Sequence, residues 1–449
     1  MSSIPPIPPH RLDPIVKAYD VRGTVPDQLD ADICHSFGAA FANFVDSEAV
    51  VVGRDMRPDG VEFSRAFADG AMSQGVDVVD IGLASTDMLY FASGHLDLPG
   101  AMFTASHNPA GYNGIKLCGP AAKPIGAETG LLEIKAAVIS GMGVTGGGSR
   151  RQVELLDDFV QHVHSFIDTS SLRPLKVVAD TANGMGGYVA PAAFAALPIE
   201  VEILYPELDG TFPNHPADPI QPENLRDLQA RVLETGADIG LAFDGDADRV
   251  FLVDEKARPV SGSLTTALVA KAMLARTGSG PIIHNLICSR STAEVITENG
   301  GEPVRTKVGH SFIKAIMAET GAAFGGEHSG HYYFRDNWRA DSGLIATMIV
   351  LEQLSASEGT LSDLIAPLDR YVASGELNTK VDDAHVVIDR VAEAYSDHPQ
   401  DRLDGLTVEM GDWWFNLRPS NTEPLLRLNL EAPTKAEVDT HVDEVRSHF

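Results

Sequence analysis

A serine in a short polar loop is the first group in this sequence that could carry covalent chemistry. Ser106 lies in the segment TASHNP, directly after the apolar run GAMF. Pro109 restricts the turn, and the glycines that follow allow the backbone to approach a ligand closely. Lys116 adds a cation further along the chain. The pattern predicts an exposed, constrained hydroxyl, although a serine that caps an Asx-Pro turn would leave the same signature.

Three aspartates at alternate positions form the second group. Asp244, Asp246 and Asp248 lie in the segment DGDADR, between two apolar runs that are typical of strands. Carboxylates at this spacing can converge on a hard cation and leave a position for a phosphate oxygen. A calcium loop of the EF-hand type would need glycine in place of Arg249 and helices on both flanks. The pattern therefore favours a Mg²⁺ site with a charge clamp over a calcium loop or a solvated acidic turn.

Two further loops are rich in hydrogen-bonding groups. The segment GGEHSGH, residues 325–331, supplies an acid, a hydroxyl and imidazoles that could bind sugar hydroxyls or a transition metal. The segment RPSNTEPLLR, residues 418–427, places short polar side chains between two arginines, a composition typical of a phosphate site. A plain surface turn would explain either loop taken alone.

The elements that must position these loops alternate between strand and helix, which argues for α/β layers. Apolar, strand-like runs and helical patterns follow one another, with strands at 49–53, 176–180 and 281–286, and helices at 60–75, 224–236 and 264–276. Each of these strand-like runs is followed by another strand that ends in a polar loop. We therefore expect a threefold repeat of one α/β unit, in which each copy contributes one loop to a shared site.

Changes in composition mark the expected domain boundaries. The glycine-rich segment at 141–150 is typical of a flexible linker, and further boundaries are expected near 254–259 and 367–371. The predicted domains, each with one of the four loops in chain order, are 1–150, 151–257, 258–368 and 369–449. The last of these has the pattern of a smaller α+β domain. The segment SSIPPIPP at residues 2–9 is expected to be a loose tail.

The composition excludes some classes of partner. A net charge of −29 argues against nucleic acid, whose phosphates are neutralised by lysine and arginine. No run approaches the roughly 18 apolar residues needed to span a bilayer, so we expect no membrane association. Three scattered cysteines without metal-type spacing favour a reducing cytoplasm. A small anionic substrate requires only that the few cations are concentrated locally.

The four loops in this order, together with KAYDVRG at residues 17–23, resemble the α-D-phosphohexomutase family. The likeness is greatest to its phosphomannomutase/phosphoglucomutase branch and covers the chain from about Lys17 to its end. It implies an α/β protein with three similar α/β domains with mixed sheets and a C-terminal smaller α+β domain, arranged around one central cleft. One position departs from the pattern, because many relatives carry lysine or arginine just before Cys288, where this chain has Ile287. That departure puts one substrate-phosphate contact in doubt.

The resemblance also implies a role for each group. Ser106 would carry a phosphate and hold Mg²⁺ together with Asp244, Asp246 and Asp248. The residues expected to take part in catalysis are Ser106, Lys116, Arg249 and His331, with Lys116 and His331 as candidates for general base and acid. The residues expected to bind substrate are Tyr19, Arg22, His107, Asn108, Gly309, His310, Glu327, Ser329, Arg418, Ser420, Asn421, Thr422 and Arg427.

The activity implied is an intramolecular phosphoryl transfer that interconverts hexose 1-phosphate and hexose 6-phosphate through a 1,6-bisphosphate. Mannose is the expected sugar and glucose a second. The expected cofactors are Mg²⁺ and the hexose 1,6-bisphosphate, and the expected partner is a small-molecule phosphosugar, bound by a monomer or small homo-oligomer. Two alternatives stay open: a metal-dependent sugar phosphatase, which would not need a second phosphate clamp, and a phosphoglucosamine mutase of the same family. A calcium-binding module or a structural role would leave most of the loops unexplained.

Overall fold

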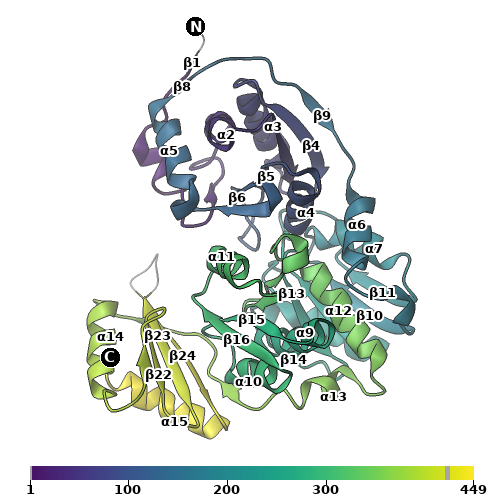
Figure 1. Cartoon of the computed structure of the whole chain (residues 1–449), viewed down its shortest axis with the longest axis vertical. Helices are drawn as coiled ribbons and strands as arrows, with labels where there is room; N and C mark the ends of the chain where they lie inside the picture. Colours follow the sequence, from purple (N-terminus) through teal and green to yellow (C-terminus); the bar gives the residue numbers. More distant parts are fainter. Residues whose placement is uncertain (1–2, 420–424) are drawn as a thin grey trace. The chain divides into compact units, whose positions relative to one another are not determined.

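The structure, a computed structural model, describes residues 3–419 and 425–449, with the side chains of His310 and Ser311 excepted. The chain divides into two compact units. Figure 1 labels their helices and strands. The first unit comprises Met1–Val260 and Ser329–Ser362, and the second comprises Ser261–His328 and Asp363–Phe449. Each unit is described by itself below.

A mixed sheet opens the first unit, with strand order β2-β6-β5-β3-β4-β9 and with β7 paired to β6. Its strands are β2 (Val21–Thr24), β3 (Ala49–Arg54), β4 (Asp77–Leu83), β5 (Gly100–Phe103), β6 (Tyr112–Gly119), β7 (Lys123–Ile125) and β9 (Arg150–Gln152). The helices around it are α1 (Pro9–Leu12), α2 (Ala31–Val45), α3 (Gly60–Met72), α4 (Thr86–Leu96), η1 (Pro120–Ala122), η2 (Ala127–Thr129) and α5 (Leu131–Ser140).

The centre of this sheet is apolar because both of its faces are covered. Strand β5 is buried throughout and β3 is buried along most of its length, as is usual for central parallel strands. Strand β3 runs parallel to β5, with Arg54 opposite Phe103, so the two carboxyl ends lie side by side. The turn that follows β3 therefore lies next to the TASHNP loop that follows β5.

The second sheet of the first unit has the order β11-β10-β12-β13-β14. Its strands and helices are α6 (Leu156–His164), η3 (Thr169–Ser171), β10 (Leu175–Asp180), α7 (Gly186–Phe194), β11 (Ile199–Leu204), η4 (Pro222–Leu225), α8 (Arg226–Thr235), β12 (Ile239–Phe243), β13 (Val250–Asp254) and β14 (Pro259–Val260). Strands β12 and β13 are wholly buried and form an antiparallel hairpin that pairs Phe243 with Val250. The acidic segment DGDADR is therefore the loop of a buried hairpin.

A later stretch of chain returns to the first unit. It contains β18 (Tyr332–Phe334), η5 (Arg335–Asn337) and α12 (Gly343–Ala356). Helix α12 is buried along nearly its whole length, which fits its almost entirely apolar sequence. An isolated antiparallel bridge joins His331 to Arg249, so the end of the GGEHSGH segment is fixed to the end of the acidic hairpin loop.

The second unit contains the parallel strands β15 (Gly280–Asn285), β16 (Gly301–Thr306) and β17 (Phe324–Gly326), in the order β16-β15-β17. Helices α9 (Gly262–Thr277), α10 (Arg290–Glu298) and α11 (His310–Thr320) accompany these strands, and α13 (Leu361–Ile365) precedes the last part of the chain. The alternation of strand and helix that the sequence predicts is thus present here too.

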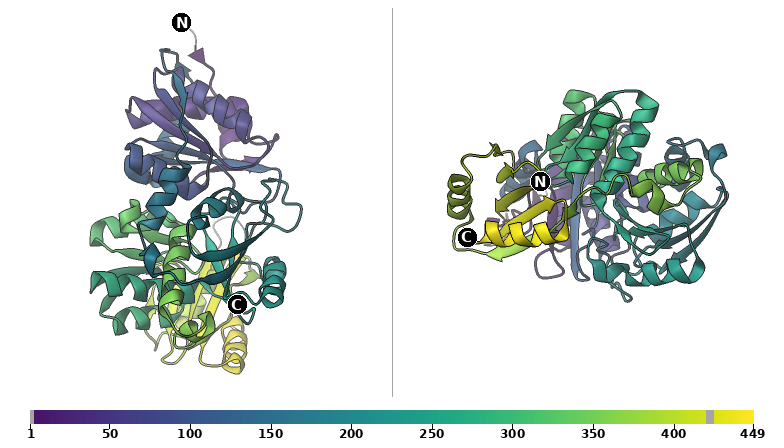
Figure 2. Two further views of the ribbon diagram at one scale, coloured as in Figure 1. Left: turned by 90° about the vertical axis from the view of Figure 1, so that its right-hand side faces the viewer. Right: turned by 90° about the horizontal axis from the view of Figure 1, so that it is seen from below.

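The last part of the chain is an antiparallel sheet with the order β19-β24-β23-β22-β21 and with β20 paired to β24. Its elements are β19 (Val372–Ala373), β20 (Leu377–Lys380), α14 (Ala384–Ala394), β21 (Gln400–Asp401), β22 (Leu406–Glu409), β23 (Trp414–Pro419), β24 (Leu425–Ala432) and α15 (Lys435–Arg446). Alternate strand residues such as Phe415 and Leu417 share one core with both helices, which cover one face of the sheet (Figure 2). This is the α+β pattern predicted for the C-terminus.

The expectation of a loose N-terminal tail is wrong for the residues described. Strand β1 (Ser3–Ile4) pairs with β8 (Met142–Gly143), inside the segment expected to be a flexible linker. Ile4 and Ile7 are buried, and the Ile7 N–H donates to the Val138 carbonyl at 3.1 Å. The two isoleucines gain apolar burial, and the extended backbone around the prolines lets them reach the core.

The strands and helices predicted from the apolar pattern are confirmed. The strand-like runs are β3, β10 and β15, and the helical patterns are α3, α8 and α9. In the part of the chain that the structure describes, no helix has both the length and the apolar composition needed to cross a bilayer.

Candidate active site

Ser106 lies in the loop between β5 and β6, in a backbone conformation that is rare for residues other than glycine. Its φ is 48°, in the left-handed region, and its N–H donates to Thr104 Oγ1 at 2.9 Å. The Ser106 hydroxyl donates to Asp244 Oδ2 at 2.8 Å. The side chain expected to be exposed is covered by these neighbours, and Ser106 is only 5% exposed. The loop of the acidic hairpin, which contains Asp244, covers this side chain.

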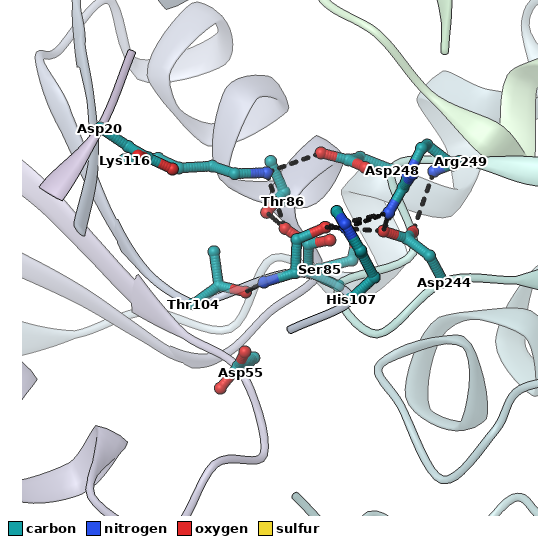
Figure 3. Close-up of polar contacts among 12 residues, drawn as sticks. Asp20, Asp55, Ser85, Thr86, Thr104, His107, Lys116, Asp244, Asp248 and Arg249 are labelled. Carbon is teal, nitrogen blue, oxygen red and sulfur yellow. Dashed lines mark hydrogen bonds and ion pairs between the residues drawn. The ribbon is translucent and has the colours of Figure 1, made fainter. Parts of the chain in front are cut away.

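The three aspartates of this hairpin loop converge on the serine. Asp244, Asp246 and Asp248 are all buried, and the group is close enough for one oxygen of each to share a cation. A tight turn makes this possible, since Ala247 has a φ of 59° and its N–H donates to the Asp244 carbonyl at 3.1 Å. The three carboxylates therefore lie close together, and Figure 3 shows those of Asp244 and Asp248.

Two groups, one on β6 and one at the start of α4, hold these carboxylates. Lys116 Nζ donates to Asp246 Oδ2 at 2.7 Å and to Asp248 Oδ2 at 2.8 Å. The Thr86 hydroxyl, at the start of α4, donates to Asp246 Oδ2 at 2.6 Å. Figure 3 shows Lys116 and Thr86 reaching the acidic loop from the side of the first sheet.

The remaining carboxylate oxygens are free to bind a cation. Among the described residues, Asp246 Oδ1 and Asp248 Oδ1 are buried and have no hydrogen-bond partner. Buried polar atoms are normally satisfied, so two such oxygens beside Ser106 indicate a missing ligand. Because every donor atom in this set is an oxygen, the set fits a hard divalent cation rather than a transition metal.

The charges at the site are strongly coupled. Burial raises the pKa of Asp244 to about 7, even though Arg249 opposes this shift. Burial alone would raise the pKa of Asp246. The charge of Lys116 and the hydrogen bonds that Asp246 accepts from Lys116 and Thr86 outweigh burial, so the pKa of Asp246 is lowered. The site therefore keeps Asp246 ionised and resists a full negative charge on Asp244 unless further positive charge is present.

Arg249 is buried between the hairpin loop and the serine loop. Its Nε donates to Asp244 Oδ2 at 3.0 Å, and its Nη2 lies 3.4 Å from Ser106 Oγ. The same guanidinium donates to His107 Nδ1, so that nitrogen must be the acceptor and the ring proton sits on Nε2. The positive charge of Arg249, with burial, lowers the pKa of His107 to about 2. His107 is thus a neutral acceptor beside Ser106.

Neighbouring carboxylates raise the pKa of both His331 and Lys116. His331 Nδ1 lies 2.8 Å from Asp341 Oδ2 and 3.9 Å from Asp248 Oδ1. Burial would lower the pKa of His331, but the nearby Asp248 and Asp341 outweigh it and raise the pKa. Burial likewise opposes the charge of Lys116, yet Asp246 and Asp248 raise its pKa well above the usual value. In this arrangement Lys116 is an ammonium that can donate a proton.

The KAYDVRG segment also reaches the serine loop. Arg22, on β2, donates from Nη1 to Asn108 Oδ1 at 2.6 Å, and it also forms an ion pair with Asp20. Tyr19 lies half-buried just before β2. Arg22 therefore lies beside the loop that carries Ser106.

In the second unit, Glu327 organises a small polar cluster. The Glu327 carboxylate accepts from Asn285 Nδ2 at 3.2 Å and from the Gly309 N–H at 3.2 Å. Gly309 has a φ of 133°, a conformation open to glycine, and α11 begins with the next residue, His310. Ser329, half-buried, belongs to the first unit, so the two units share the GGEHSGH segment.

The C-terminal sheet places the two predicted arginines opposite each other. Arg418 on β23 is paired in register with Arg427 on β24. Glu376, just before β20, forms ion pairs with both arginines. Its Oε2 lies 2.6 Å from Arg418 Nη2, and its Oε1 lies 3.6 Å from Arg427 Nη1. Two adjacent guanidinium groups repel unless an anion lies between them, and Glu376 supplies that charge here. Ser420, Asn421 and Thr422 lie outside the described residues.

Comparison with known families gives a match along nearly the whole chain. Family models of phosphoglucomutase/phosphomannomutase match in chain order: alpha/beta/alpha domain I at residues 13–141, domain II at 157–258, domain III at 261–371 and the C-terminal domain at 376–448. The chain belongs to the phosphoglucomutase/phosphomannomutase family. The predicted fold class and the predicted enzyme class, an intramolecular phosphotransferase, are both confirmed.

Individual relatives cover almost the full length of the chain. A phosphohexose mutase of Xanthomonas campestris pv. campestris is 41% identical over 440 residues, which are 96% of this chain and 98% of that protein. A phosphomannomutase of Escherichia coli (strain K12) is 40% identical over 429 residues, with 93% and 94% covered. The X-ray structure of a Burkholderia thailandensis phosphoglucomutase/phosphomannomutase family protein superposes with a TM-score of 0.89 at 36% identity and covers 97% of this chain and 96% of that one.

The position that departs from the expected pattern is apolar in the structure as well. Ile287 follows β15, is 7% exposed, and offers no charge to a phosphate. Position 287 therefore offers no charged side chain for the substrate-phosphate contact that the sequence put in doubt.

Sequence reasoning missed several residues that hold the site together. Thr86 contacts Asp246, Asp341 contacts His331, and Glu376 contacts both arginines of the last domain. None of these residues lies in a loop with unusual composition. The only signal was the type of residue at a helix or strand start, and that signal is common in any α/β protein.

Proposed function

We propose that this phosphohexomutase interconverts hexose 1-phosphate and hexose 6-phosphate through a phosphoserine at Ser106, with mannose and glucose as its sugars. The observation that carries the proposal is the 2.8 Å hydrogen bond from Ser106 Oγ to Asp244 beside two unpartnered carboxylate oxygens. A hydroxyl at the edge of an oxygen-lined cation site is well placed to exchange a phosphoryl group. Relatives at about 40% identity are named phosphohexose mutase and phosphomannomutase, which supports the substrate class.

The chemical step transfers one phosphoryl group between two oxygens. The P–O bond to Ser106 Oγ breaks while phosphorus bonds to the free hydroxyl oxygen of the hexose phosphate. The proton of that hydroxyl passes to a nearby base, and a proton returns to Ser106 Oγ, so charge and atoms balance. The product is a hexose 1,6-bisphosphate, and the reverse transfer of its other phosphate to Ser106 completes the isomerisation.

Charged side chains of the chain stabilise the group in transfer. Arg249 Nη2 lies 3.4 Å from Ser106 Oγ, which is close enough for it to donate hydrogen bonds to the oxygens of the phosphoryl group. Lys116, held as an ammonium by Asp246 and Asp248, can donate a proton to a departing oxygen. His331, oriented by Asp341 at 2.8 Å, has its other ring nitrogen available to exchange a proton with a sugar hydroxyl.

We propose Mg²⁺ as the cation, held by Asp244, Asp246 and Asp248 with an oxygen of the phosphorylated Ser106. When bound, it neutralises charge on the transferring phosphoryl group. Oxygen ligands alone suit Mg²⁺, and a phosphate oxygen is a usual member of its ligand set.

Thr86 offers a test of this metal site. Thr86→Val removes the hydroxyl that donates to Asp246 Oδ2 at 2.6 Å but keeps the shape of the side chain. Because such outer hydrogen bonds orient the ligand, the Mg²⁺ concentration for half-maximal activity should rise about 10- to 100-fold. Thr86→Ser, which keeps the hydroxyl, should behave like the wild type. A Thr86→Val enzyme with the wild-type Mg²⁺ titration curve would exclude this role.

A second phosphate site is required because the bisphosphate has two ends. Arg418 and Arg427 face each other across β23 and β24 with Glu376 between them. We propose that they bind the phosphate that is not reacting, together with Ser420, Asn421 and Thr422. Two arginines in fork geometry are typical of phosphate recognition. A phosphatase that releases inorganic phosphate would have no use for such a clamp.

The sugar preference should be modest. Glucose and mannose differ only at C2, and the groups proposed to hold the sugar, Glu327 and Ser329, are expected at the 3- and 4-hydroxyls. A substrate that binds in two opposed orientations cannot be held tightly at C2 in both. We therefore expect the kcat/KM values for mannose 1-phosphate and glucose 1-phosphate to differ by less than about 10², or under roughly 3 kcal/mol.

The assay uses both sugar phosphates with Mg²⁺ and the same trace of hexose 1,6-bisphosphate. A preference of a thousandfold or more would mean that an additional residue recognises C2. Release of free sugar and inorganic phosphate, without isomerisation, would identify a phosphatase instead. Glucosamine phosphate in the same assay tests the phosphoglucosamine mutase alternative.

We propose the cytoplasm as the compartment, which suits cysteines that are scattered and buried.

A further inference from the structure

A buried arginine from a neighbouring turn lies beneath the serine loop. Arg57, in the turn after β3, is only 2% exposed. Its Nη2 donates to the carbonyls of Ser106 at 2.9 Å and Asn108 at 2.6 Å. Its Nη1 donates to the carbonyls of Pro109 at 3.0 Å and Tyr112 at 2.8 Å. One guanidinium therefore binds three carbonyls of the loop that carries the reactive hydroxyl and the carbonyl of Tyr112, the first residue of β6.

Burying these charged groups costs free energy, so a contribution to fold stability is a weak explanation for the arrangement. The nearest countercharge is Asp55, whose Oδ2 is 3.4 Å from Arg57 Nε and which is fully buried as well. Burial lowers the pKa of Arg57 and raises that of Asp55 to about 6, so neither charge is well solvated. Buried ion pairs of this kind often contribute little net stability. The guanidinium also packs against the ring of Phe212, with 5.2 Å from its carbon to the ring centroid.

The serine loop needs such a support because its backbone is strained. The φ of 48° at Ser106 lies in the left-handed region, which is unfavourable for residues other than glycine. The Ser106 carbonyl is confined on its other side by Gly245 of the metal loop, where an added Cβ would lie 2.4 Å from that oxygen. Arg57 and Gly245 thus fix the Ser106 carbonyl, and this orientation directs Oγ to Asp244 at 2.8 Å.

We propose that Arg57 is a positioning residue for phosphoryl transfer, which holds the serine loop so that Ser106 Oγ faces the metal carboxylates. The inference rests on the proposed function and adds a residue that touches neither phosphate nor sugar. It predicts that loosening Arg57 lowers kcat and the rate at which Ser106 takes phosphate from the bisphosphate. The KM for hexose phosphate should change little, because the sugar and the distant phosphate are held by other loops.

The test replaces Arg57 with lysine, whose single ammonium cannot reach all four carbonyls. For Arg57→Lys, we expect kcat to fall about 100-fold or more, since small misplacements of reacting groups cost that much. The KM should stay within about threefold, and intact mass should show slower phosphorylation of Ser106 by glucose 1,6-bisphosphate. Arg54→Lys is the matched control, because Arg54 ends β3 and, among the described residues, its guanidinium hydrogen-bonds only to the Asp55 carbonyl, at 3.5 Å; it should keep wild-type kinetics.

A purely structural role predicts a different result, namely a lower melting temperature with unchanged kcat per folded molecule. Folded Arg57→Lys protein with kcat within threefold of the wild type would overturn the proposal. If that variant does not fold, Phe212→Leu decides, because it removes only the ring against which the guanidinium packs. It should lower kcat several-fold at constant KM, and an unchanged kcat would overturn the proposal. An inactive wild-type protein would instead refute the proposed function.

Discussion

Ser106→Ala should abolish isomerase activity, with kcat reduced by about 10⁴-fold or more, while the protein stays folded. The substitution removes the oxygen that would carry the phosphate, and no other hydroxyl in the described structure contacts both Asp244 and Arg249. Losses of this size are typical when a covalent nucleophile is deleted. Steady-state kinetics with mannose 1-phosphate and a bisphosphate primer measure the effect.

The stability of Ser106→Ala should change by no more than about 1 kcal/mol, because one neutral hydroxyl is lost. Asp244 Oδ2 keeps its hydrogen bonds from Arg249 at 2.8 and 3.0 Å, so no buried charge is left without a partner. Thermal unfolding of the variant and the wild type tests this directly. Ser140→Ala, at an exposed serine at the end of α5, is a matched control for loss of a hydroxyl.

The location of the phosphate provides a second readout that does not depend on turnover. After incubation with a hexose 1,6-bisphosphate, peptide mapping should find phosphate on Ser106 of the wild type and none on the Ser106→Ala protein. Phosphate on another residue, with Ser106 unmodified, would contradict the proposed mechanism. Wild-type activity in Ser106→Ala would contradict it as well.

The sequence predicted the parts of the site that depend on spacing within a single loop. Asp244, Asp246 and Asp248 lie close together because a short antiparallel hairpin leaves little room for its loop residues to separate. The strands on either side are apolar except for Asp254 at the end of β13, so the position of the loop between them could be predicted. Local geometry of this kind is encoded by neighbouring residues.

Groups that come together from distant segments were not predictable in this way. Thr86 and Asp246 are 160 positions apart in the chain, and their hydrogen bond depends on how α4 meets the hairpin loop. Arg57 lies in the segment RDMRPDG, which has the composition of an exposed charged turn. Arginine is rarely fully buried, so nothing in the local pattern predicted that this one would point inward.

Burial of Ser106 was missed for the same reason. A polar loop that follows a strand usually lies at the surface, but here the acidic hairpin packs over Ser106 and leaves it 5% exposed. The N-terminal segment shows the opposite error. Prolines made residues 3–9 resemble a loose tail, whereas Ile4 and Ile7 are buried and β1 pairs with β8. Both errors arise from contacts with elements remote in sequence.

Chelation by EDTA should reduce the activity of the wild type to background, and added Mg²⁺ should restore it. Asp246 and Asp248 each use one oxygen to accept from Lys116, and their other oxygens have no hydrogen-bond partner within the described residues. Without a bound cation, Lys116 and Arg249 are the only positive groups of the described structure within hydrogen-bonding distance of the three carboxylates. These charges are too few to neutralise the carboxylates together with a phosphoryl group, so transfer should fail.

Binding of the cation can be measured apart from activity. A ligand that binds the folded state raises stability by RT ln(1 + [L]/Kd), so millimolar Mg²⁺ should raise the melting temperature of the chelated wild type. Asp246→Asn removes one ligand charge and should lose both this shift and most activity, whereas Glu234→Gln, at an acid on α8 outside the site, should keep both. Restoration by Zn²⁺ alone would point to the histidines of the GGEHSGH segment. Full activity after thorough chelation would refute the assignment of Asp244, Asp246 and Asp248, because nothing else in the proposal lets this site work without a bound cation.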